Sequence, residues 1–156
     1  MSDVEFSPEL SRRGVLAGLS AAAAVVALAP SQAHATKAEA DDLVAKLAGG
    51  AKPQDNGKVK IKLPEIAENG NTVPLTVTVE APMTEASYVK ALHVMAEGNP
   101  SPQVASFHFT PTGKAEVYCR IRLGKTQDVR AVAVLSDGQV WEAKKEVKVT
   151  VGGCGG

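Results

Sequence analysis

Between residues 58 and 151 apolar and polar residues alternate with a period of two, and this pattern constrains the fold more than any other feature. Alternation is typical of β-strands, because successive side chains of a strand point to opposite faces of a sheet. Turn residues interrupt it, among them Asn69-Gly70-Asn71 and the hairpin signal Asp137-Gly138. Strands are predicted at residues 58–63, 73–79, 88–96, 104–110, 115–123, 129–135 and 140–151.

These strands predict an all-β fold, an immunoglobulin-like antiparallel β-sandwich of about seven strands formed by residues 58–151. The length of 156 residues fits a single domain of this kind. The Cys…Trp…Cys spacing of antibody domains is absent from the sequence.

Residues 36–57 are predicted to form a short helix and a loop that precede the sandwich. Thr36 and Glu39 have the T-x-x-E spacing of a capping box, a narrow apolar stripe follows, and Gly49-Gly50 would end the helix. The adjacent carboxylates Asp41 and Asp42 fit the solvated face of such a helix better than an acid–base pair.

Residues 1–35 are predicted to be a twin-arginine signal peptide rather than part of the fold. Arg12-Arg13 precedes an uncharged, alanine-rich segment, and an Ala-x-Ala site predicts cleavage after Ala35. A membrane anchor is the alternative, but the apolar run of about 15 residues is short of the roughly 20 that cross a bilayer. The mature chain is therefore expected in the periplasm.

Composition and spacing argue against several classes of function. The chain has 17 basic and 17 acidic residues, so it lacks the net positive charge that is typical of proteins that bind nucleic acid or an anionic membrane. His93 and His108 lack the spacing of zinc ligands, and we expect structural or surface histidines and no metal. The sequence contains no GxSxG nucleophile elbow, and Gly152-Gly153 precedes no helix that could bind phosphate.

Cys119 lies in a predicted strand and shares a face with apolar neighbours such as Val117 and Ile121. The simplest interpretation is a small buried hydrophobic residue. A disulfide to a partner chain is the second interpretation. An internal bond to Cys154 is the third, although it would tether the end of the chain.

The sequence ends in Gly152, Gly153, Cys154, Gly155 and Gly156. Glycine has no Cβ, so this segment would be a slim and flexible arm. At roughly 3.3–3.6 Å per residue, Cys154 could extend about 10 Å beyond the last strand and enter a narrow channel. The composition therefore favours a thiol that reaches outward.

Three other interpretations of the arm remain open. It could be a frayed end, as termini often are. It could belong to a periplasmic binding or structural module whose terminal cysteine makes only an intermolecular disulfide. It could also belong to a thiol enzyme, although the arm offers neither a resolving cysteine nor a base.

The signal, the predicted sandwich and above all the GGCGG end resemble the SoxY family, the sulfur-carrier subunits of bacterial sulfur-oxidation (Sox) systems. Further similarity lies in residues 88–100 (YVKALHVMAEGNP), 104–111 (VASFHFTP) and 146–156 (EVKVTVGGCGG). The resemblance covers essentially the whole mature chain.

The resemblance implies a carrier rather than an enzyme, with thiosulfate and its oxidation intermediates attached covalently to Cys154 and no cofactor. It implies a SoxZ-like β-sandwich partner in a heterodimer, or a higher oligomer through a Cys154 disulfide. It also implies three enzymes as partners: a haem-containing loading enzyme, a sulfate-releasing hydrolase and a sulfane-oxidising enzyme. No role is implied for Cys119.

Overall fold

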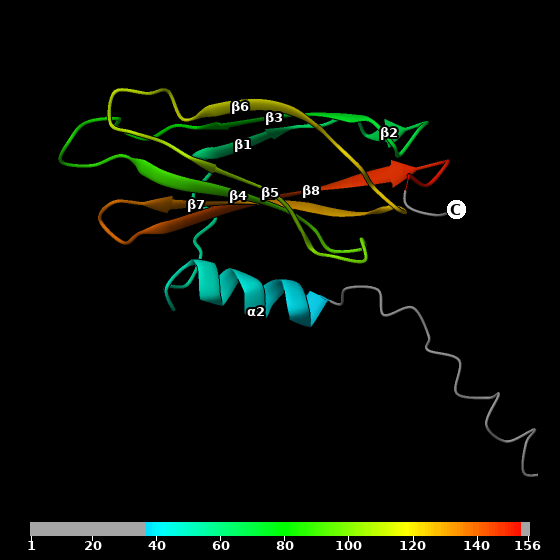
Figure 1. The fold of residues 1–156 in the computed structure, drawn as a ribbon, viewed down its shortest axis with the longest axis horizontal. Helices are drawn as coiled ribbons and strands as arrows, with labels where there is room; N and C mark the ends of the chain where they lie inside the picture. The colour runs from blue at the N-terminus through cyan, green and yellow to red at the C-terminus, as the bar shows by residue number, and fades with distance from the viewer. Residues whose placement is uncertain (1–36, 154–156) are drawn as a thin grey trace, which may run out of the picture. The chain divides into compact units, whose positions relative to one another are not determined.

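The computed structural model describes residues 37–153 of the chain (Figure 1). The predicted signal peptide, and Cys154, Gly155 and Gly156 of the predicted arm, lie outside these residues. The described part consists of one helix and eight strands: α2 (Lys37–Leu47), β1 (Val59–Lys62), β2 (Ile66–Ala67), β3 (Val73–Val79), β4 (Val89–Ala96), β5 (Gln103–His108), β6 (Glu116–Ile121), β7 (Gln127–Leu135) and β8 (Val140–Val149).

The strands form two sheets that pack face to face, which confirms the predicted β-sandwich. The smaller sheet has the order β1-β3-β6 and the larger one β2-β8-β7-β4-β5. All pairings between neighbours are antiparallel except that of β2 with β8. The seven predicted strands are all present, and β2 is an eighth strand that the sequence did not indicate. With two residues, β2 is too short to show a period.

The core lies between the two sheets, where the apolar residues of the alternating pattern meet. Burying each such aliphatic side chain stabilises the fold by about 1.5–3 kcal/mol. The fully buried side chains include Leu75 and Val77 of β3, Leu92 and Val94 of β4, Val129 of β7 and Val147 of β8.

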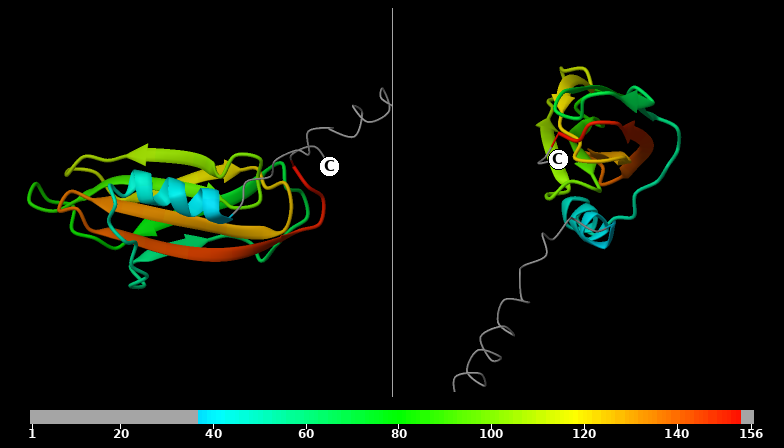
Figure 2. Two further views of the ribbon diagram at one scale, coloured as in Figure 1. Left: turned by 90° about the horizontal axis from the view of Figure 1, so that it is seen from below. Right: turned by 90° about the vertical axis from the view of Figure 1, so that its right-hand side faces the viewer.

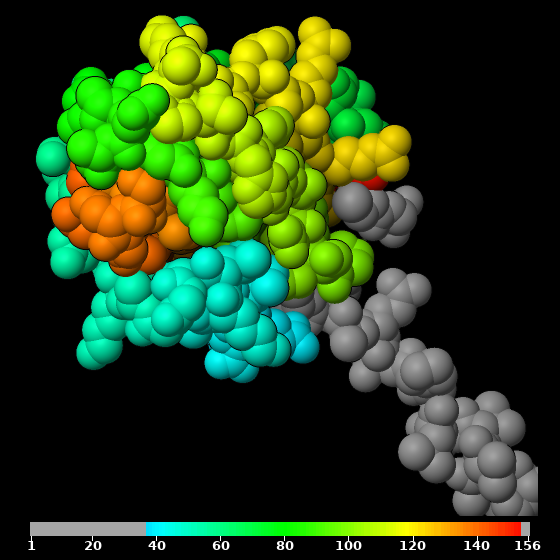
Figure 3. All heavy atoms as spheres, turned by 60° about the vertical axis from the view of Figure 1, so that its left-hand side comes forward, coloured from blue at the N-terminus to red at the C-terminus, as the bar shows by residue number. Residues whose placement is uncertain are grey.

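Helix α2 covers the outer face of the larger sheet, on the side away from the smaller sheet (Figures 1 and 2). Val44 and Ala48 pack there against Met95 and Val132, so strands β4 and β7 are buried on both faces. Figure 3 shows the helix, in cyan, lying along this face. No helix within residues 37–153 has the length and the apolar character needed to cross a bilayer.

A buried arginine joins the helix to the sheet. Arg130 of β7 is 4% exposed, and its Nη1 donates to Asp41 Oδ1 of α2 at 2.7 Å. Its Nη2 lies 2.9 Å from Glu97 Oε1, which also lies 3.1 Å from Lys144 Nζ. The hydrogen bond from Arg130 lowers the pKa of Asp41, more than desolvation raises it. Asp41 thus serves in the attachment of the helix.

Candidate functional site

The structure follows the predicted arm as far as Gly153, so its first two residues can be placed. Gly153 N donates to Leu123 O at 2.9 Å, and Val151 O accepts from Gly70 N at 2.7 Å. Gly70 O in turn accepts from Leu123 N at 2.8 Å. Three segments therefore meet, residues 69–71, 123–124 and 151–153, which we call the glycine clasp.

The clasp brings backbones closer than any side chain would permit. A Cβ on Gly152 would lie 2.3 Å from Gly124 O, and one on Gly153 would lie 2.4 Å from Gly70 O. A Cβ on Gly70 would lie 2.2 Å from Leu123 O. None of these three glycines has a positive φ. Close approach, as well as flexibility, thus explains why glycine occupies these positions.

The clasp changes where the free part of the arm can begin. The sequence predicts an arm from residue 152 onward, but Gly152 and Gly153 contact the sandwich at one end of the fold (Figure 1). The arm's described base is therefore a fixed part of the domain. Cys154 follows it directly in the sequence.

Two buried amide side chains hold the middle segment of the clasp. Asn99 Oδ1 accepts from Gly124 N and from Gln127 Nε2, both at 2.9 Å, while Asn99 Nδ2 donates to Arg122 O at 2.8 Å. Gln127 Oε1 accepts from Gly98 N at 2.7 Å. Buried polar groups need such partners. The sequence shows Gly98-Asn99-Pro100 only as a turn, and nothing in it links Asn99 to the arm.

Cys119 lies on β6 and is half-buried against the core between the sheets, beside Val117. It forms no disulfide with a described residue. Burial raises the pKa of its thiol. Because the thiolate is the reactive form, this burial makes Cys119 poorly suited to covalent chemistry. Its predicted structural or intersubunit role stays a prediction.

We expect the two cysteines to differ in reactivity. In the native chain at pH 8, iodoacetamide should modify Cys119 at least about ten-fold more slowly than Cys154, because burial lowers the thiolate fraction of Cys119. Peptide mapping over a time course measures both rates. A sample unfolded in urea serves as the control and should lose the difference. Equal rates in the native chain would contradict this assignment.

The two histidines lie side by side on β4 and β5. His93 is buried and its Nδ1 lies 2.8 Å from Ser106 Oγ, while His108 is exposed, as predicted. Their rings meet edge to face at 6.3 Å. Within residues 37–153 no cluster of three or more histidines, cysteines or carboxylates could hold a metal ion. Burial, and to a smaller extent the nearby His108, lowers the pKa of His93.

This lowered pKa predicts a pH dependence of stability. The unfolded chain takes up a proton at the ordinary histidine pKa of 6.5, before folded His93 does. The free energy of unfolding should therefore fall as the pH drops through 6.5 and level off below the folded pKa. Urea unfolding between pH 8 and pH 5 should show a flatter profile for His93→Gln. If the free energy of unfolding of His93→Gln depended on pH as steeply as that of the wild type, the pH dependence would come from groups other than His93.

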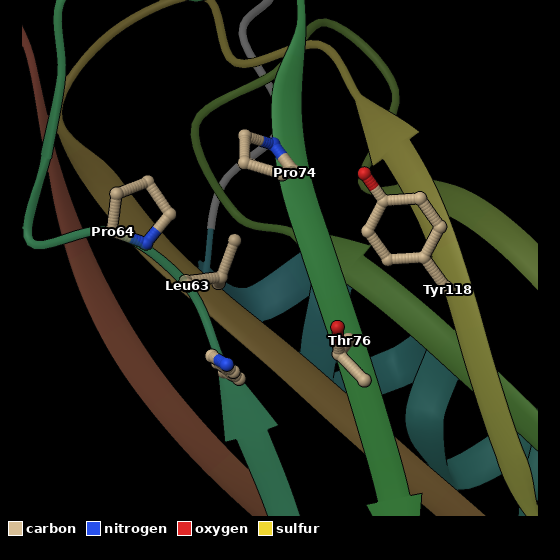
Figure 4. A pocket seen from close by; sticks show the side chains of 6 residues that line it. Leu63, Pro64, Pro74, Thr76 and Tyr118 are labelled. Atoms are coloured by element: carbon tan, nitrogen blue, oxygen red, sulfur yellow. The ribbon is translucent and has the colours of Figure 1, made fainter.

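A second surface feature lies on the outer face of the smaller sheet. Pro74 and Thr76 of β3, with Leu63 and Pro64 after β1, surround a hollow of about 340 Å³ (Figure 4). Tyr118 of β6 closes one side and is 67% exposed. The residues that line the hollow do not form a recognisable catalytic or metal-binding group, but they present apolar surface to solvent.

Comparisons with known proteins agree with the fold and add the family. The family described as "Sulfur oxidation protein SoxY" matches residues 44–154. The sulfur carrier protein SoxY from Chlorobium limicola f thiosulfatophilum is 38% identical, with a TM-score of 0.62 over 71% of this chain and 96% of that one. A search of curated proteins gave no match.

Two more distant structures share the fold alone. The superoxide reductase (neelaredoxin) from Ignicoccus hospitalis is 23% identical, with a TM-score of 0.52 over 74% of this chain and 94% of that one. A putative superoxide reductase from Thermotoga maritima is 19% identical, with a TM-score of 0.54 over 64% and 93%. The family match extends over all eight strands of the sandwich and through the clasp to the cysteine, so this chain belongs to the SoxY family.

Proposed function

We propose that the chain carries thiosulfate and its oxidation intermediates covalently on Cys154. One observation carries this proposal: the family match runs through the GGC sequence and ends at residue 154, the cysteine itself. As a member of the SoxY family the chain is a carrier protein, not an enzyme. In our proposal Gly152 and Gly153 are the fixed base of the arm, and Gly155 and Gly156 complete the arm that presents the thiol.

Loading is an oxidation of the thiol. Cys154–SH and thiosulfate would form Cys154–S–S–SO₃⁻, releasing one proton and two electrons. The electrons would pass to the haem-containing loading partner that membership of the SoxY family implies. The bond formed joins the cysteine sulfur to the outer sulfur of thiosulfate.

Unloading then proceeds in two stages. A hydrolase partner would use water to cleave the bond between the outer sulfur and the sulfonate group, giving sulfate, Cys154–S–S⁻ and two protons. A further enzyme would oxidise the remaining sulfane sulfur. Covalent attachment keeps each intermediate near its enzymes at high effective concentration, whereas a free anion would diffuse away.

The same proposal places the chain in the periplasm with a second subunit. Arg12-Arg13 and the cleavage site after Ala35 support twin-arginine export, which carries proteins that are already folded. A SoxZ-like partner without its own signal would be exported in the same complex. The exposed Tyr118 and its neighbouring hollow offer apolar surface to which such a partner could bind.

Intact mass spectrometry tests the carrier role. The protein is purified from thiosulfate-grown cells and weighed before and after treatment with a reductant. We expect a mass increase that the reductant removes and that peptide mapping assigns to Cys154. If the only modification of Cys154 were a stoichiometric disulfide to another chain that no sulfur-oxidising enzyme opens, the protein would be a structural module instead.

Fractionation tests the location and the partner. We expect the chain in the periplasmic fraction, with its mature N-terminus at Thr36 and a small β-rich subunit that co-purifies. An Arg12→Lys, Arg13→Lys double variant should remain in the cytoplasm. Periplasmic export of that variant would argue against the twin-arginine route.

A further inference from the structure

An open hollow of about 460 Å³ lies next to the glycine clasp, between the edges of the two sheets. Arg120 and Arg122 line it from the β6 side. Asn99 and Ser101 line it from the loop between β4 and β5, and Gln103 lines it from the start of β5. No carboxylate is among its lining residues in the described part of the chain.

The positive charges of Arg120 and Arg122 are not paired with carboxylates of the described residues. Both are exposed, and neither guanidinium has an ion pair or a side-chain hydrogen bond with a described residue. Arg130, in contrast, forms ion pairs with Asp41 and Glu97. Two residues apart on an extended chain, Arg120 and Arg122 point to the same side, with Cα atoms about 7 Å apart. Guanidinium groups in such a pair suit an anion with several oxygens.

The hollow is connected to the base of the arm through short contacts. Asn99 lines the hollow and also binds Gly124 N and Arg122 O. Gly153 N in turn binds the carbonyl of Leu123, the residue after Arg122. Gly153, the residue to which Cys154 is joined, is thus linked to the rim of the hollow through the backbone of residues 122–124.

We propose that Arg120 and Arg122 form a resting site for the sulfonate end of an adduct carried on Cys154. This inference rests on the proposed carrier function. The adduct Cys154–S–S–SO₃⁻ ends in three oxygens that accept hydrogen bonds, and its tether to Gly153 supplies a high effective concentration. A weak anion site is therefore sufficient.

The resting site would distinguish the states of the carrier. After sulfate leaves, the remaining Cys154–S–S⁻ has no sulfonate oxygens and loses its contacts with the two guanidinium groups. The loaded arm is then held at the hollow, and the arm bearing only sulfane sulfur is released from it.

The test uses the full chain, with any co-purifying subunit retained, loaded chemically at Cys154. The thiolate attacks tetrathionate, forms Cys154–S–S–SO₃⁻ and releases thiosulfate, and mapping verifies the position. The Nε–Hε NMR signals of Arg120 and Arg122 should shift on loading, whereas that of Arg130 should not. A neutral carbamidomethyl group on Cys154 should leave all three signals in place.

A kinetic measurement on variants complements the spectra. A neutral phosphine should remove the adduct about three- to ten-fold faster from Arg120→Gln, Arg122→Gln than from the wild type, because the bound adduct is shielded. Lys90→Gln, which removes an exposed cation near the other end of β4, should match the wild type. A neutral mixed disulfide on Cys154 should be removed equally fast from all three proteins.

Unchanged arginine signals together with equal removal rates would overturn the resting site. That outcome differs from failure of the carrier role, because failure of the carrier role is the absence of any sulfur adduct on Cys154 in protein from thiosulfate-grown cells. A chain that carries native adducts but shows no arginine response would keep its function and lose this site.

Discussion

Replacing Cys154 with serine is expected to abolish thiosulfate-dependent growth while leaving the sandwich folded. A hydroxyl cannot form the S–S bond to thiosulfate, so no adduct can form and every later step lacks its substrate. Core burial and the clasp contacts involve residues 37–153, so the melting temperature should change by less than about 2 °C. Complementation of a deletion strain measures growth, and thermal unfolding of the purified variant measures stability.

Cys119→Ser provides the matched control for this experiment. It also removes one thiol, but from a half-buried position against the core. We expect the growth of this variant to be retained and its stability to fall by about 1 kcal/mol, since a hydroxyl replaces a partly buried sulfur. Partial growth of the Cys154→Ser strain would contradict the covalent mechanism, whatever the behaviour of Cys119→Ser.

The sheets were predictable from the sequence because each strand carries its own periodic signal. The residues of β3, from Val73 to Val79, alternate strictly, and the structure gives the strand these same bounds. β4 was also found, although it is buried on both faces and loses clear alternation. Both faces of β4 are buried because α2 packs on the outer one, and the sequence of the strand alone does not predict this contact.

The glycine clasp was beyond prediction because its three segments are distant in sequence. Gly70 and Gly124 lie in a turn and a loop, and a glycine in such a place ordinarily supplies conformational freedom. The same holds for Asn99, whose amide serves Gly124 and Arg122 more than 20 residues away. Close backbone approach leaves no periodic trace in a sequence, so only the fold shows it.

The sequence predicts the chemistry of the arm, but it does not indicate how the base of the arm is held. The composition of residues 152–156 predicts that Cys154 is a reactive group, and the family match extends to the same residue. The sequence could not say that Gly152 and Gly153 are bound to the sandwich. A carrier thiol that starts from a fixed point can be presented to a partner in a defined direction, which a longer flexible arm could not do.

Gly70→Ala is expected to destabilise the domain and to displace the base of the arm. The new Cβ would lie 2.2 Å from Leu123 O and 2.8 Å from Gly153 N. Both are backbone atoms, so a rotamer change cannot relieve the overlap. Overpacking of this kind costs about 1–3 kcal/mol, and weakening of the three clasp hydrogen bonds would add about 1 kcal/mol each. Together these two effects predict a loss of about 4–6 kcal/mol in urea unfolding.

Gly113→Ala is the matched control for the substitution itself. Its new Cβ would have its closest neighbour, Thr110 O, at 3.3 Å, and Gly113 also has no positive φ. We expect a change within about 0.5 kcal/mol. An unchanged stability of Gly70→Ala, with Gly113→Ala also unchanged, would show that the clasp backbone can yield without penalty.

Gly153→Ala separates the role of the clasp in stability from its role in presenting the thiol. Its Cβ would clash with Gly70 C and O, but residues 151–153 can leave the surface and so relieve the overlap. Leu123, in contrast, is part of the sandwich and cannot leave when residue 70 gains a side chain. Gly153→Ala should therefore cost about 2 kcal/mol, because residues 151–153 lose their two clasp hydrogen bonds, and this is less than the loss expected for Gly70→Ala. It should still accelerate hydrogen exchange of the residue-153 amide and slow loading of Cys154 by the partner enzyme about ten-fold, while a small thiol reagent reacts at the wild-type rate. If enzymatic loading were unaffected, the clasp would serve the stability of the fold alone.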